Sequence, residues 1–75
     1  MNHSFTLDMA DALAKRLESE AGDDLTAQVD RGFVLVFGRT PLETESDASV
    51  QLVEQHGLIA FCRVLLNTNE FIYLQ

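Results

Sequence analysis

Two apolar runs constrain this chain more than any other feature of its sequence. Phe33–Phe37 is apolar at all five positions, and Leu58–Leu66 carries a single charged residue, Arg63. Successive side chains of a β-strand point to opposite faces of a sheet, so each run would form a strand that is apolar on both faces. A chain of 75 residues can lay one layer of helix over only one of those faces. The sequence therefore predicts a protein whose second sheet face is covered by a partner.

Length and charge narrow the class of protein. The 75 residues fit one compact domain, residues 1–75. Twelve Asp and Glu residues oppose five Lys and Arg residues, which gives a formal net charge of −7. Such a surface repels phosphate backbones and anionic lipids, so we expect no direct binding to nucleic acid or to a membrane. The first residues lack the pattern of a signal peptide, and no apolar run approaches the roughly 20 residues that span a bilayer. We therefore expect a cytoplasmic protein.

Two segments carry the spacing of amphipathic helices. Leu7–Ala21 places apolar residues at helical intervals and is followed by Gly22, which suits the left-handed position after a helix. Glu45–His56 is predicted as a second helix, and Thr44 and Asp47 match the spacing of a capping box at its start. A strand is the alternative for this second segment, because apolar residues also alternate within it.

The remaining segments favour two β-hairpins. Leu25–Val29 alternates between apolar and polar residues, and Asp30–Gly32 would form a turn with Gly32 at positive φ before the strand Phe33–Phe37. A second hairpin would join Leu58–Leu66 to Phe71–Leu74 through Asn67–Asn69. A helix through Leu58–Leu66 is the rival interpretation, which the preceding Gly57 disfavours.

The predicted fold class is therefore α+β, with two helices on one face of a small antiparallel sheet in the order α-β-β-α-β-β. An uncovered apolar sheet face marks an interface. We expect partner binding there through Phe61, Arg63, Ile59 and Ile72, with Phe61 as the aromatic anchor. The order of elements resembles that of the small acidic homodimers that act as type III secretion chaperones, without a shared motif and in a shorter chain.

Groups that carry chemistry are sparse. His3, His56 and Cys62 do not have the spacing of a zinc module. Cys62 is the only cysteine, and its apolar surroundings predict a buried side chain rather than a nucleophile. Asp23 and Asp24 are expected in a solvated turn. The sequence thus predicts no catalytic residue, no cofactor and no metal, and the protein is not expected to be an enzyme.

Three functions compete on this basis. The first is a protein-interaction module, a homodimeric adaptor or secretion-type chaperone that binds another protein through an apolar sheet face. The second is an acidic inhibitor that mimics nucleic acid, which requires the acidic residues to cluster on one face. The third is a small enzyme or ligand-binding subunit, for which Cys62, Arg39 and Arg63 are the candidate residues.

Overall fold

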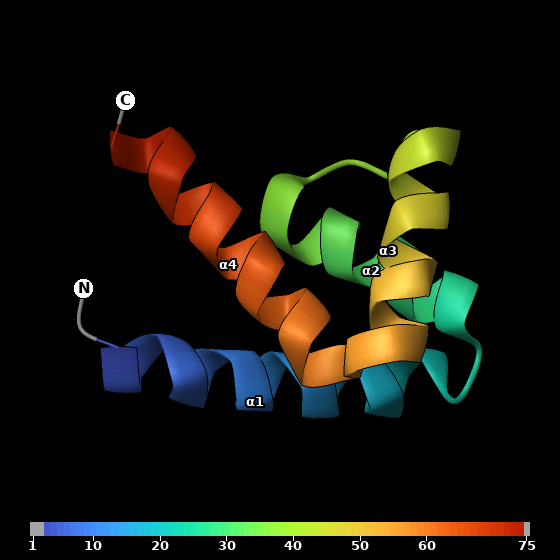
Figure 1. Cartoon of the computed structure of the whole chain (residues 1–75), viewed down its shortest axis with the longest axis horizontal. Coiled ribbons are helices and arrows are strands. Elements are labelled where there is room, and N and C mark those ends of the chain that lie inside the picture. Colours follow the sequence, from blue (N-terminus) through green and yellow to red (C-terminus); the bar gives the residue numbers. More distant parts are fainter. Residues whose placement is uncertain (1–2, 75) are drawn as a thin grey trace.

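The computed structural model describes the backbone of residues 3–74 and the side chains of residues 9–69. Within this range the chain forms four helices and no strand: α1 (His3–Ala21), α2 (Leu25–Phe37), α3 (Glu43–His56) and α4 (Leu58–Leu74). In Figure 1, α3 and α4 meet at a corner and diverge from it like the arms of a V, while α1 crosses beside the corner. The predicted α+β fold, with its antiparallel sheet and two hairpins, is wrong.

The first predicted hairpin is the single helix α2. This helix contacts α1, α3 and α4, and a helix that is covered on several sides can carry a continuous apolar run. Val29 and Phe33 are buried in the core, and Val34–Phe37 are half-buried. The apolar run that looked like a two-faced strand is therefore the second half of a central helix. Gly32, predicted to close a turn, lies inside this helix and does not have positive φ.

The second predicted hairpin is α4. Leu58, Phe61, Cys62 and Leu65 recur at i, i+3, i+4 and i+7, and this face is buried or half-buried against the rest of the bundle. Arg63 points to solvent from the other side of the helix. The predicted turn Asn67–Asn69 and the predicted strand Phe71–Leu74 both belong to α4.

Both predicted helices are confirmed. α1 contains Leu7–Ala21 and α3 contains Glu45–His56. Gly22 adopts the expected left-handed conformation after α1, with φ of 68°. Ala10 and Ala14 of α1 are buried, and α1 makes its most extensive contact with α4.

The end of α1 and the start of α2 are held by side-chain hydrogen bonds that the sequence pattern did not predict. Asp24 caps α2, because its carboxylate accepts a hydrogen bond of 3.3 Å from the backbone N–H of Ala27. The buried Gln28 donates from Nε2 to the carbonyl of Gly22 at 2.6 Å, which fastens α2 to the end of α1. The predicted capping box at Thr44 and Asp47 is wrong, since both residues lie inside α3.

Gly32 sets the distance between α2 and its neighbours. A Cβ atom on this residue would lie 3.0 Å from Leu65 Cδ1, 3.0 Å from Phe61 Cε2 and 3.4 Å from Leu17 Cδ1. The first two distances are shorter than ordinary carbon contacts, which lie at about 3.5–4.0 Å. The absence of a Cβ atom at Gly32 therefore permits close packing here, whereas its φ is not positive and does not itself call for glycine.

We predict that Gly32→Ala destabilises the protein by about 1 kcal/mol. Replacing a glycine inside a helix by alanine stabilises the helix by about 0.5–1 kcal/mol, but overpacking a core destabilises the fold by about 1–3 kcal/mol. Urea denaturation measures the difference, with the exposed helical substitution Gln51→Ala as the control that should change little. A Gly32→Ala protein more stable than the parent would show that the core yields easily at this position.

Candidate functional site

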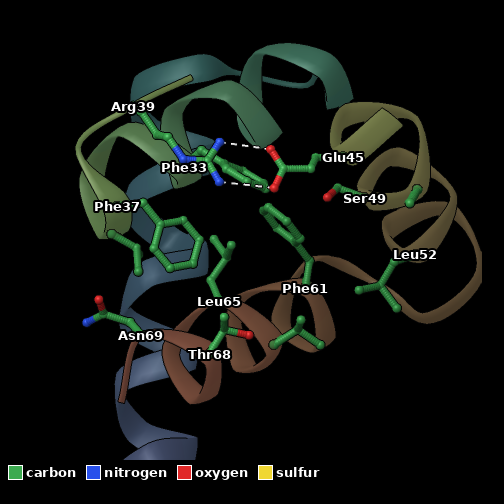
Figure 2. A pocket seen from close by; sticks show the side chains of 13 residues that line it. Phe33, Phe37, Arg39, Glu45, Ser49, Leu52, Phe61, Leu65, Thr68 and Asn69 are labelled. Atoms are coloured by element: carbon green, nitrogen blue, oxygen red, sulfur yellow. Dashed lines mark hydrogen bonds and ion pairs between the residues drawn. The ribbon is translucent and has the colours of Figure 1, made fainter. Parts of the chain in front are cut away.

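A groove of about 670 Å³ opens between α2, α3 and α4 (Figure 2). Two of its walls are single helical faces, each with residues at i, i+3, i+4 and i+7. The α3 wall is Glu45, Ala48, Ser49 and Leu52, and the α4 wall is Phe61, Val64, Leu65 and Thr68, followed by Asn69. α2 contributes Phe33, Val36 and Phe37. The groove is thus mainly apolar, with a few polar groups at its edge.

Three phenylalanine rings form the inner part of the groove. Phe33 lies edge-on to Phe37, with ring centroids 5.4 Å apart, and is stacked on Phe61 at 6.3 Å. Phe33 and Phe61 are buried, whereas Val64 at the outer edge is 49% exposed. An apolar side chain with half of its surface in water, beside half-buried Leu52, gives the groove an apolar lining that a second molecule can contact.

A charged pair spans one end of the groove (Figure 2). Arg39 donates from its two terminal nitrogens to the two carboxylate oxygens of Glu45, at 2.8 and 3.0 Å. The guanidinium carbon lies 5.5 Å from the ring centroid of Phe33 and 5.9 Å from that of Phe37, within cation–π range. Arg39 therefore joins the end of α2 to the start of α3 across the aromatic rings.

Glu45 serves two purposes at once. Besides pairing with Arg39, it accepts a hydrogen bond of 2.8 Å from the backbone N–H of Leu42, the residue that precedes α3. The hydrogen bonds from Arg39 and then from Leu42 lower the pKa of Glu45 from 4.5 to about 2. The pKa of Arg39 is raised by the same pairing. Both groups are therefore charged at neutral pH, and their charges cancel.

The residues predicted for partner binding are divided by the helical structure. Phe61 is 1% exposed and faces the core, whereas Ile59 is 38% exposed and Arg63 is exposed on another side of α4. Ile72 lies outside the described side chains. The premise that Ile59, Phe61 and Arg63 share one strand face is wrong, and the role of all four residues in partner binding stays a prediction. The strand interpretation of Leu58–Leu66 missed Val64 as a groove residue, and Leu52 on the predicted helix was not identified as one, although the helical spacing of both walls is present in the sequence.

The candidates for chemistry differ in their exposure to solvent. Cys62 is fully buried, as predicted, and burial raises the pKa of its thiol to about 12. His56 is exposed at the end of α3, beside Glu18 and Lys15 of α1. Among the described residues, no group of three or more His, Cys, Asp or Glu side chains is placed to hold a metal ion.

The exposed acidic residues are spread over several elements. Asp11 pairs with Lys15 at 3.3 Å, and Glu20 pairs with both Arg16 and Arg31. The hydrogen bond from Arg16 lowers the pKa of the Glu20 carboxyl most, and the hydrogen bond from Arg31 lowers it further. Other acids lie in the α1–α2 turn, on α2 and on α3, so the described acidic residues are distributed over three helices and a turn.

Comparison of the chain with protein-family models, with curated proteins and with solved structures found no match. In the part of the chain that the structure describes, every helix falls short of the length or hydropathy needed to cross a membrane.

The lowered pKa of Glu45 predicts a pH-dependent contribution to stability. A carboxyl whose pKa is lower in the folded than in the unfolded state stabilises the fold above its ordinary pKa, here 4.5, and loses this effect as the pH falls towards about 2. Glu45→Gln should therefore lower the melting temperature at pH 7, and its difference from the parent should shrink below pH 4.5.

Thermal melts followed by circular dichroism at pH 7 and about pH 2.5 measure this difference. Arg39→Gln serves as the second variant, because it removes the partner and should show the same shrinkage. If Glu45→Gln lowered the melting temperature by the same amount at both pH values, the charge of Glu45 would not be what stabilises the loop.

Burial of Cys62 predicts that a thiol reagent modifies it only after the protein unfolds. The thiolate is the reacting form, and the pKa of about 12 leaves very little of it at pH 8. Labelling should be slow in buffer and should accelerate with urea, whereas a Cys introduced at the exposed α1 position Ser19 should react at once. Fast labelling of Cys62 in the native protein would contradict its placement in the core.

Proposed function

We propose that this chain is a protein-interaction module and that its groove receives the apolar face of a helix from another protein. The observation that carries the proposal is the open, mainly apolar groove, in which the edge residue Val64 remains 49% exposed. Concave sites lined mainly by apolar and aromatic side chains, with a few polar groups, are the usual setting of binding sites.

The shape of the groove favours a helix as the occupant. The α3 and α4 walls each run for two helical turns, from Glu45 to Leu52 and from Phe61 to Thr68, which is about 10 Å of helix. Grooves between helices bind amphipathic helices through anchors at i, i+3, i+4 and i+7. A helix laid between the two walls would cover Val64 and Leu52 together.

A different protein is favoured over a second copy of this chain. The reason to expect a homodimer was an uncovered sheet face, and the described residues form no sheet. Two copies would bring together two net charges of −7, and like charges oppose association. An adaptor role remains part of the proposal, but the likeness to sheet-containing secretion chaperones no longer supports it.

The other functions receive less support. Mimicry of nucleic acid needs a continuous acidic face, whereas the described acids are dispersed and Asp11, Glu20 and Glu45 are held in ion pairs. Enzymatic use of Cys62 is disfavoured by its burial and by the raised pKa of its thiol.

The proposal is tested with a synthetic, fluorescently labelled helical peptide of about 18 residues. The peptide carries Leu and Phe at i, i+3, i+4 and i+7 and Lys and Ala elsewhere. Binding is measured by anisotropy against the parent, Val64→Asp and Ile59→Asp. Both variants place a carboxylate at an exposed β-branched position of α4, but Val64 alone lines the groove.

We predict that Val64→Asp raises the Kd at least about tenfold, because a charge would enter an apolar contact. Ile59→Asp should change it less than about twofold. Circular dichroism confirms that both variants fold. Absence of binding, or equal effects of the two variants, would overturn the proposal, as would sedimentation showing a dimer of this chain that Val64→Asp dissociates.

A further inference from the structure

We infer that Leu42 is a further contact residue for the helix that the groove receives, and that this helix carries an apolar residue one turn beyond its groove anchors to meet it. The inference rests on the proposed function, because it concerns the occupant of the same groove. Leu42 does not line the groove. It lies where α3 begins, at the end of the groove that the Arg39–Glu45 pair spans.

Leu42 is the most exposed large apolar side chain among those described. It is 66% exposed, whereas the groove residue Val64 is 49% exposed. A single exposed leucine is ordinary on a protein surface, so exposure alone does not mark a binding residue. Two features of its position do.

The first feature is its contact with the groove. The backbone N–H of Leu42 donates to Glu45 Oε1 at 2.8 Å, and Arg39 donates to the same oxygen at 2.8 Å. Leu42 also precedes the groove residues Glu45 and Ser49 by three and seven residues, a spacing that places residues on neighbouring parts of one helical face. Exposed apolar surface therefore continues from the α3 wall past the end of the groove.

The second feature is that leucine is poorly suited to this position. Leu42 is the N-cap of α3 and makes no side-chain hydrogen bond to its first turn. Glu45 supplies one half of a capping box by accepting from the Leu42 N–H, but a leucine side chain has no oxygen for the other half. Serine, threonine, aspartate and asparagine stabilise a helix from the N-cap. Folding stability therefore does not account for an exposed leucine here, whereas contact with a partner does.

A helix in the groove is long enough to reach Leu42. A peptide of about 18 residues forms a helix of about 27 Å, whereas each wall is about 10 Å long. α3 and α4 meet at Gly57 (Figure 1), so a helix lying between them extends past the opposite end, where Arg39 and Glu45 lie. The turn of the occupant that leaves the groove there passes Leu42, and an apolar residue on that turn would cover it.

Three peptides test the inference. All carry the four anchors of the peptide described above, and two of them replace an alanine by leucine, either four residues before the first anchor or four residues after the last. We expect one of these extended peptides to bind the parent about fivefold more tightly than the unextended peptide, because one end of the occupant passes Leu42. The peptide that gains affinity also gives the direction in which the occupant lies.

Leu42→Ser separates partner contact from folding. Serine is the better N-cap, so this variant should melt about 2–5 °C higher than the parent. It should also abolish the gain of the extended peptide and change the Kd of the unextended peptide less than about twofold. Ile59→Ser is the matched control, since it removes an exposed apolar side chain of α4 that does not line the groove and should leave the gain intact.

The outcomes separate the two proposals. Equal affinities of the three peptides, or a gain that persists in Leu42→Ser, would overturn the role of Leu42 and leave the groove as a helix-binding site. A Leu42→Ser protein that melts below the parent would show that the fold itself needs the leucine, and would also overturn this role. Failure of all three peptides to bind would overturn both proposals.

Discussion

The close approach of α2 to the core at Gly32 is the contact on which the rest of the structure depends. With no Cβ at this position, Leu17, Phe61 and Leu65 can approach the α2 backbone from α1 and α4. That approach brings the next residue, Phe33, against Phe61 as a stacked pair. The absence of a Cβ atom at Gly32 thus lets α2 lie close to α4 at the position next to the stacked Phe33 and Phe61 rings.

The Arg39–Glu45 pair extends this arrangement from the core to the surface. Arg39 lies over the rings that Gly32 helps to position, and Glu45 holds the first turn of α3 through Leu42. Each half of the pair therefore depends on a different helix. An exposed ion pair alone contributes little stability, but this pair fixes the loop between α2 and α3, and with it the wide end of the groove. The stability that the pair adds above the ordinary pKa of Glu45 thus comes together with the positioning of this loop.

The sequence predicted the two amphipathic helices and the burial of Cys62, and it failed where apolar runs were long. A run such as Phe33–Phe37 fits a strand covered on both faces and a helix covered on several sides equally well, because periodicity disappears when all sides are buried. A helix was the alternative interpretation for Leu58–Leu66, and the i, i+4 spacing of Phe61 and Leu65 supported it. The Arg39–Glu45 pair could not be predicted, since it joins two helices across a loop and has no periodic signature.

The groove exists because the chain turns a sharp corner. Only Gly57, with φ of 93°, separates the end of α3 from the start of α4, so the two helices meet there and diverge (Figure 1). α2 fills the space between them only in part, and the walls remain apolar beyond it, as the exposure of Val64 shows. A chain of 75 residues buries a smaller share of its surface than a larger domain does. A helix placed in this wedge would bury apolar surface that the chain is too short to cover itself, which gives one physical reason for both the open groove and its proposed use.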